Sequence, residues 1–160
     1  MRPVDREAFT ELTKGVKPRL RRELRFVPEE ISDWQDRDFL AVTTRSGAEG
    51  VLLVPAETLR VAPFQLQRRR PNASGRVEAI ICDVCATWQR GSNSAIITFT
   101  KEKSSSSFLC CGDLLCSLHV RDKTAASKVS RVQLREHNTP EERISRLTSK
   151  LEAIIDTVAG

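Results

Sequence analysis

The sequence is poor in aromatic residues and has no long apolar segment. Its 160 residues include no tyrosine, two tryptophans and six phenylalanines. No apolar run approaches the roughly 18 residues that a membrane-spanning helix needs. The first dozen residues also lack the apolar core of a secretory signal. We therefore expect a cytoplasmic protein without a membrane partner.

Residue patterns that commonly carry catalysis are scarce as well. The histidines are His119 and His137, and the sequence has no serine elbow, glycine-rich phosphate loop or H-E-x-x-H motif. It therefore offers no recognisable site for a small-molecule substrate. We expect a protein that is not an enzyme.

The composition is that of a folded, moderately basic domain. Hydrophobic residues make up 39% and charged residues 29% of the chain, which is typical of globular proteins. This length suits one well-packed domain over residues 1–160. Lysine and arginine number 26 against 21 acidic residues, a net charge of +5. This excess favours an anionic partner such as RNA, the ribosome or an acidic protein surface.

Residues 1–27 are expected to form two short helices. The apolar residues recur at every fourth position, which is close to helical spacing. They are Val4, Ala8, Leu12, Val16, Leu20 and Leu24. Gly15 suits the end of a first helix over about residues 5–13, and Pro18 suits the first turn of the second.

Antiparallel strands are expected to follow over residues 38–66. Residues 38–44 and 51–54 flank a glycine-containing loop and predict a hairpin. A third strand over 61–66 should break near Pro63, because proline cannot donate a ladder hydrogen bond. Further strands are predicted at 76–81, 95–100 and 108–110, with a turn at 101–107.

The last helix has the clearest start signal. Thr139 suits the N-cap, Pro140 the first helical position, and Glu142 completes a capping box. One apolar face should pack on the core over residues 139–159. It consists of Ile144, Leu147, Leu151, Ile154, Ile155 and Val158. Residues 121–138 are polar and are expected to be irregular.

Four of the five cysteines have the spacing of a metal site. Cys82 and Cys85 form a C-x2-C pair, and Cys111 and Cys116 follow after 25 intervening residues. Two such pairs can complete a tetrahedron of thiolates, for which Zn²⁺ is the best fit. Four protein ligands leave no open position for water, so the ion should be structural. A turn, a hairpin and a helix that starts at the last ligand predict a treble clef.

Three other interpretations of the cysteines stay open. Four cysteines can also hold an iron–sulfur cluster, although the C-x4-C spacing and the strand context favour zinc. A redox C-x-x-C would normally open a helix in a βαβ unit, unlike Cys82. His119 lies one helical turn after Cys116 and could replace Cys111 or Cys116 as a ligand. Cys110 should point away from Cys111 and lie in the core.

The cysteine region resembles a known bacterial zinc-domain family. Residues 111–121, CGDLLCSLHVR, are similar to the C-x-D-L-x-C-S-L-x-V-R signature of elongation factor G-binding proteins of the FusB type. The resemblance extends to residues 82–85, to Lys14-Gly15, and to residues 38–40 with their partner strand 51–55. It implies an α+β fold with a treble-clef zinc finger over residues 76–121. It also places the zinc ligands at Cys82, Cys85, Cys111 and Cys116.

The same resemblance implies a role in translation. Family members bind elongation factor G, and some release it from the ribosome when fusidic acid has stalled it. We therefore expect a non-enzymatic zinc protein that binds elongation factor G, with the ribosome or its rRNA as a second partner. The alternative is a zinc-dependent RNA- or DNA-binding module, because treble clefs serve many functions.

Of three basic segments, two are candidate binding surfaces. Residues 121–135 leave the zinc-site helix as a predicted exposed basic stretch, carrying Arg121, Lys123, Lys128, Arg131 and Arg135. The basic face of the second helix, residues 19–25, is the next candidate. The triplet Arg68 to Arg70 is expected to be a solubilising loop, because it is shorter than a convincing nucleic-acid patch.

Overall fold

The computed structural model describes residues 1–101 and 104–159. The α-helices are α1 (Arg6–Leu12), α2 (Pro18–Glu23), α3 (Cys116–Val120), α4 (Ala125–Leu134) and α5 (Pro140–Ala159). The 3-10 helices are η1 (Pro28–Glu30), η2 (Trp34–Asp36) and η3 (Gly91–Asn93). The strands are β1 (Leu40–Thr43), β2 (Glu49–Val54), β3 (Arg60–Arg68), β4 (Ile80–Ile81), β5 (Trp88–Gln89), β6 (Ser94–Lys101) and β7 (Ser104–Cys111). No helix among these residues is long and apolar enough to cross a membrane.

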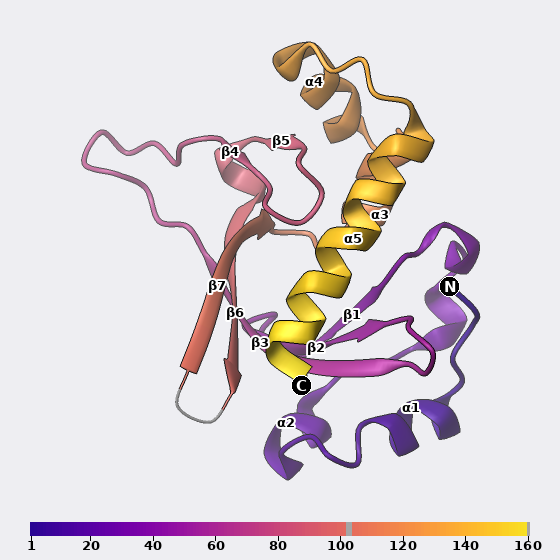
Figure 1. Cartoon of the computed structure of the whole chain (residues 1–160). Coiled ribbons are helices and arrows are strands. Elements are labelled where there is room, and N and C mark those ends of the chain that lie inside the picture. Colours follow the sequence, from indigo (N-terminus) through magenta and orange to yellow (C-terminus); the bar gives the residue numbers. More distant parts are fainter. Residues whose placement is uncertain (102–103, 160) are drawn as a thin grey trace.

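The strands form one twisted antiparallel sheet with a small ribbon inserted into it. The five-stranded sheet has the order β1-β2-β3-β6-β7, and the ribbon β4-β5 lies in the chain between β3 and β6. Helix α5 runs across the sheet, and α1 and α2 lie on the side of β1 and β2 (Figure 1). This arrangement confirms the expected α+β class with an antiparallel sheet. The pairing of Ser94 with Cys111 places that cysteine at the end of the sheet, beside the ribbon.

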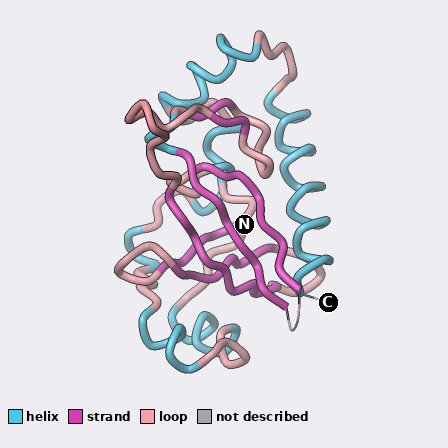
Figure 2. Tube along the Cα trace, turned by 90° about the vertical axis from the view of Figure 1, so that its left-hand side faces the viewer, coloured by secondary structure: helices cyan, strands magenta, loops and turns pink. Residues whose placement is uncertain are grey.

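Strand β2 contributes to two separate hydrophobic cores. Leu52 and Val54 belong to the main core, which contains the buried residues of α5 and the cysteines. Val51 and Leu53 point to the opposite face and pack with apolar residues of α1 and α2. Figure 2 shows α5 and the N-terminal helices as separate layers beside the strands. The sheet is therefore covered on both faces at β2.

Helix α5 begins and packs as its sequence predicts. The Thr139 N–H donates to Glu142 Oε2 at 2.8 Å, and the Glu142 N–H donates to Thr139 Oγ1 at 3.2 Å. This reciprocal pair is a capping box, with Pro140 at the first helical position. The most deeply buried apolar side chains of the helix are Leu147, Leu151, Ile154 and Ile155.

Three strand predictions are wrong in detail. β3 continues through Pro63, because its ladder with β6 spans only residues 65–68 and does not require a proline N–H. The strand expected at 76–81 is reduced to Ile80–Ile81, because the preceding residues belong to an exposed loop. In the turn expected at 101–107, Ser104 onward instead pairs with β6; residues 102–103 lie outside the described part of the chain.

Two helix predictions are also corrected. In α1 it is Phe9, not Ala8, that is buried, and it stacks on Phe26 with ring centroids 4.2 Å apart. The region 121–138 is not irregular, because it contains α4. The buried residues of α4 are Ser127 and Ser130, and the Ser130 hydroxyl accepts the Trp88 N–H at 2.8 Å. An apolar pattern could not reveal a helix that docks through serines.

Candidate metal centre

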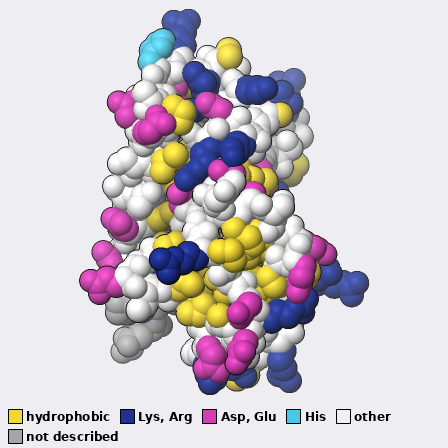
Figure 3. Space-filling model, turned by 90° about the vertical axis from the view of Figure 1, so that its right-hand side faces the viewer, with side chains coloured by type: hydrophobic (Ala, Val, Ile, Leu, Met, Phe, Trp, Pro, Cys, Tyr) yellow, Lys and Arg dark blue, Asp and Glu magenta, His cyan; other side chains and the backbone are white. Residues whose placement is uncertain are grey.

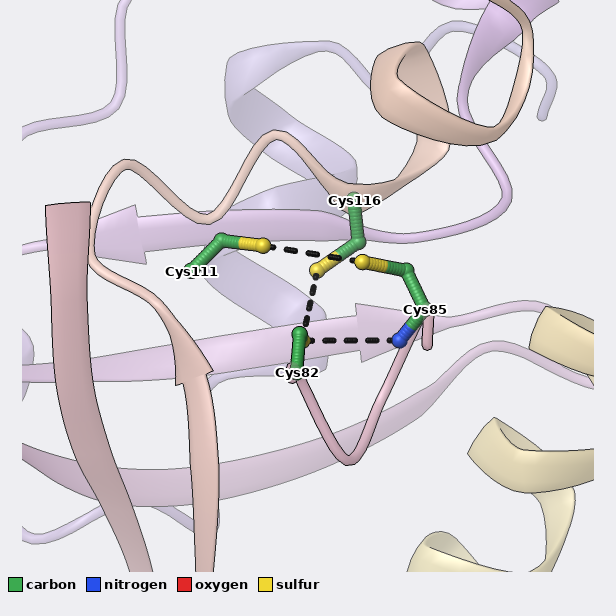
Figure 4. Close-up of side chains that lie close together, drawn as sticks. All are labelled: Cys82, Cys85, Cys111 and Cys116. Atoms are coloured by element: carbon green, nitrogen blue, oxygen red, sulfur yellow. Dashed lines mark hydrogen bonds between the residues drawn. The ribbon is translucent and has the colours of Figure 1, made fainter. Parts of the chain in front are cut away.

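The first cysteine pair lies on the turn between β4 and β5. Cys82 follows β4, and the chain reverses through Ala86, which has a φ of 55°. The Ala86 N–H donates to the Cys82 carbonyl at 2.8 Å, and the Cys82 N–H donates to the Thr87 carbonyl at 2.9 Å. This closed turn directs the thiols of Cys82 and Cys85 toward the other pair (Figure 4).

The second pair lies where the sheet passes into a helix. Cys111 is the last residue of β7, and Cys116 is the first residue of α3. Between them Leu114 has a φ of 56°, and its N–H donates to the Cys111 carbonyl at 3.0 Å. The turn thereby brings Cys111 and Cys116 to one side of the chain, facing the first pair (Figure 4).

The four thiols lie at the separations that a tetrahedral zinc ion needs. Their sulfur atoms all lie within 4.8 Å of one another. The Cys82–Cys116 and Cys85–Cys111 Sγ distances are 3.9 and 3.5 Å. Sulfurs about 2.3 Å from a central ion in a tetrahedron are about 3.8 Å apart. Each of these cysteines is at most 1% exposed, and the group fits a structural zinc site.

Hydrogen bonding among the thiols already favours a thiolate at one position. The nearby Cys111 and Cys116 thiols hold the pKa of Cys82 well below its usual value. Interaction with Cys111, and then with Cys82 and Cys85, raises the pKa of Cys116. Because metal ligation requires thiolates, Zn²⁺ binding at this site should release protons.

Polar side chains that sequence reasoning missed hold the two turns in place. Thr87 Oγ1 lies 2.9 Å from Cys85 Sγ and accepts a hydrogen bond from Gln89 Nε2 at 2.8 Å. The Asn93 side chain accepts the Asp113 N–H at 3.0 Å and donates to the Asp113 carboxylate at 2.9 Å. Such outer contacts fix the orientation of metal ligands.

Asp83, inside the first cysteine turn, ties that turn to the sheet. Its N–H donates to the Leu109 carbonyl at 2.8 Å, and its carboxylate accepts the Leu109 N–H at 2.7 Å. The turn thus pairs with the outer edge of β7, next to Cys111. In the sequence, the only sign of this contact between the turn and β7 is the aspartate between the two cysteines.

His119 and Cys110 lie near the centre with other partners. His119 Nδ1 lies 2.7 Å from Thr124 Oγ1, and Nε2 lies 3.2 Å from Asp113 Oδ1. Burial opposes ionisation of Asp113, yet hydrogen bonds from His119 and the Leu115 N–H hold its pKa below the usual value. The ligand atoms of His119, Cys111 and Asp113 also lie within 4.8 Å of one another, so these three residues form a second group that could hold a metal ion. Cys110 is buried in the main core, where burial raises its pKa.

The basic stretch predicted at 121–135 is not a free cationic surface. Arg121 pairs with Asp38, Lys123 with Asp36, and Arg131 with Asp122. Within residues 1–101 and 104–159, Lys128 and Arg135 are the cations of this stretch without a carboxylate partner. Figure 3 likewise shows basic and acidic side chains interspersed over one face of the molecule. The expectation that residues 121–135 expose five free cations is therefore wrong for Arg121, Lys123 and Arg131.

Comparison with known protein families gives one match. The model of the FBP C-terminal treble-clef zinc-finger family matches residues 6–158. No curated protein and no solved structure matches the chain significantly. The matched region contains all four clustered cysteines, the whole sheet and nearly all of α5.

Proposed function

The chain belongs to the FBP C-terminal treble-clef zinc-finger family, and on this premise we propose that it binds elongation factor G and modulates translation without catalysing a reaction. The observation that carries the proposal is the buried group of four thiols within the matched region. We assign the zinc ligands to Cys82, Cys85, Cys111 and Cys116. Ribosomal association, including contacts with rRNA, is part of the same proposal.

In this proposal the metal is a scaffold. The four thiols leave no ligand position open to water, which a catalytic zinc site requires. A bound ion would join the β4-β5 turn to the end of β7 and the start of α3. Zinc binding would thereby contribute folding free energy and keep nearby surfaces rigid.

We propose the groove along β1 as the surface that receives elongation factor G. This groove of about 560 Å³ follows the outer edge of β1, where Arg25 pairs with Thr43, and reaches the second cysteine turn at residues 113–115. Phe26 and Ile31 line it with apolar surface. Arg25 and Arg45 also line it and have no carboxylate partner among the described residues. Apolar anchors beside two unpaired cations suit a protein partner with acidic residues near its contact site.

A pull-down from native lysate tests the function. The tagged, zinc-loaded chain should retain elongation factor G after nuclease treatment, and the Cys82→Ser variant should lose it. If every protein recovered from untreated lysate is lost after nuclease treatment, the result would reject this function. It would support the zinc-dependent RNA- or DNA-binding alternative.

Charge reversal tests the groove separately. Arg25→Glu combined with Arg45→Glu should weaken binding of purified elongation factor G by at least about tenfold, mainly through a slower association rate. Arg21→Glu combined with Arg22→Glu changes the net charge equally and is the matched control on α2. Equal losses in both variants would remove the groove from the interface.

A further inference from the structure

The connection between β3 and β4, residues 69–79, is an arm that projects from the sheet away from α1 and α2 (Figure 1). Its tip is closed by Asn72, whose side-chain oxygen accepts the Ser74 N–H and the Arg76 N–H, both at 3.0 Å. The Asn72 N–H donates to the Arg76 carbonyl at 2.8 Å. Gly75, with a φ of 75°, completes the turn. The tip therefore has a defined conformation although its residues are exposed.

The base of the arm is anchored on the zinc-site region. The Arg69 N–H donates to the Ser94 carbonyl at 3.3 Å, and its guanidinium donates to the Glu78 carbonyl at 3.1 Å. The returning segment of the arm lies so close to η3 that a Cβ at Gly91 would overlap the Val77 carbonyl. Glycine at position 91 is thus required for the arm to pack here.

Four arginines share this surface. Arg70 and Arg76 flank the tip, Arg90 precedes η3, and the Arg68 guanidinium lies over Gly112 in the second cysteine turn. All four side chains are exposed, and in the described parts of the chain none has a carboxylate within ion-pair distance. Residues 67–91 contain only two acids, and the carboxylate of one of them, Asp83, already accepts the Leu109 N–H. The arm and its base therefore carry more positive than negative charge, since Glu78 is the other acid of this segment and these four arginines form no ion pair among the described residues.

The chemistry of this surface fits phosphate better than protein. Guanidinium groups bind phosphate oxygens with paired hydrogen bonds, and an ordered arm loses little entropy on binding. Protein interfaces depend on aromatic or large apolar anchors, and residues 69–79 contain no aromatic residue. Residues 69–79 likewise offer no aromatic ring on which single-stranded bases could stack.

We propose that the arm, with Arg68, Arg70, Arg76 and Arg90, binds the phosphate backbone of double-helical RNA. The choice of RNA over DNA rests on the proposed function in translation. Base edges are not read, so binding depends on duplex shape and charge and not on sequence. The triplet at 68–70, expected from the sequence to be a solubilising loop, is in this proposal one part of a binding surface completed by Arg76 and Arg90.

Titration of the zinc-loaded chain against a labelled RNA duplex of about two helical turns tests the proposal. Arg70→Gln, Arg76→Gln and Arg90→Gln together should weaken binding at least about tenfold and reduce the slope of log K against log salt by about 3. Arg21→Gln, Arg22→Gln and Arg135→Gln remove the same charge elsewhere and should leave the affinity within about threefold. Equal losses in the two triple variants would overturn the assignment, as would tighter binding of a DNA duplex of the same sequence.

A glycine pair tests whether the arm must be held in place. Gly91→Ala removes no charge but displaces the arm, so the affinity for duplex RNA should fall severalfold. Gly15→Ala is the control, because a Cβ there meets nothing within 4 Å. Zinc content verifies that both variants fold. Unchanged RNA affinity in Gly91→Ala would overturn the inference that the fixed position of the arm matters for binding.

The arm variant also separates this inference from the proposed function. Its retention of elongation factor G in the nuclease-treated pull-down should equal that of the unmodified chain. Weak RNA binding by the unmodified chain, with elongation factor G retained, would reject the RNA surface alone. Loss of elongation factor G from the arm variant would instead assign the arm to the protein interface and overturn the RNA proposal.

Discussion

At the scale of single residues, Asp122 connects α3, α4 and α5 through one carboxylate. It follows α3 with a φ of 56°. Both oxygens accept hydrogen bonds from Arg143 in α5, at 3.0 and 2.7 Å, and Arg131 in α4 donates to the carboxylate at 2.9 Å. The Arg143 side chain is only 1% exposed, so its charge depends on this partner. This contact places the C-terminal helix relative to the zinc-site helix.

Asp122→Asn should therefore lower the free energy of unfolding by about 3 kcal/mol, because it leaves Arg143 buried without a full counter-charge. This is the lower end of the range for broken buried pairs, since Asp122 itself is partly exposed. Urea denaturation followed by circular dichroism measures the change. Asp156→Asn, which breaks the exposed pair with Arg60, is the control and should cause little loss. Similar losses in both variants would contradict the prediction.

The same pair predicts a dependence on pH. The Arg143 guanidinium lowers the pKa of Asp122, so ionised Asp122 stabilises the folded state. The stabilisation is complete above the unfolded-state pKa of about 3.9 and disappears as the pH falls through the lower folded-state pKa. The stability difference between the unmodified chain and Asp122→Asn should be constant near pH 7 and shrink below about pH 4. A difference that persists unchanged to lower pH would exclude this mechanism.

The adjacent cysteines of β7 should behave differently when each is replaced. Cys111→Ser should lose the bound zinc, because it removes one of four ligands, whereas Cys110→Ser should retain it. Metal content of the purified proteins, measured by mass spectrometry, gives the answer. His119→Ala should also retain zinc, because both ring nitrogens have other partners. Zinc loss in His119→Ala with zinc retained in Cys111→Ser would change the ligand assignment.

At the scale of elements, the capping box should decide the stability of the first turn of α5. Thr139→Ala removes the acceptor of the Glu142 N–H and should cost about 1 kcal/mol. Thr148→Ala is a matched control, because this exposed hydroxyl bonds only to the Ile144 carbonyl within the same helix. Thermal unfolding of the two variants should separate them clearly. If the control is destabilised as much, the cap has no special role.

Elements with a local signal could be predicted from the sequence. α5 carries a capping box and an apolar face, and the β1-β2 hairpin carries β-branched residues around a glycine loop. α4 and the start of β7 had no such signal. Ser130 docks α4 on Trp88, and Ser104 to Ser107 are strand residues because β6 offers a partner. In both cases long-range contacts override the preferences of the local sequence.

At the candidate metal centre, too, local sequence signals were sufficient for some residues and not for others. Cysteine spacing was sufficient to single out the four clustered thiols, because two short turns each contribute a pair. Asn93 could not be found in this way, since its contacts with Asp113 depend on how η3 packs against the second turn. The sequence also could not show that the basic stretch after α3 is partly neutralised. Two of its ion pairs are with Asp36 and Asp38, which lie more than 80 positions earlier in the chain.

At the scale of the whole molecule, we propose that residues 1–160 unfold as one cooperative unit. The two hydrophobic cores share β1 and β2, and the candidate zinc site lies within the main core. The two tryptophans report on different parts, because Trp34 packs against the N-terminal core and Trp88 lies in the zinc-site ribbon. Trp34→Phe and Trp88→Phe variants should therefore show coincident urea transitions by fluorescence. Separate midpoints would divide the molecule into two domains.

Removal of the metal should change this behaviour. A chelator should lower the midpoint reported by Trp88, because zinc ligation contributes folding free energy to the ribbon. Through the shared strands, the midpoint reported by Trp34 should fall with it. A midpoint unchanged by complete zinc removal would mean that the thiol cluster folds without an ion.

The burial of β2 on both faces has a consequence for shortened forms of the protein. A chain that began at β1 would retain every clustered cysteine and α5, yet it would leave Val51 and Leu53 uncovered. Together with Leu40 and Val42 these side chains would form an apolar strip beside the free edge of β1. Exposed apolar strands at a sheet edge recruit other chains. Proteolytic loss of α1 and α2 should thus make the remaining chain aggregate, so we expect the N-terminal helices to prevent self-association.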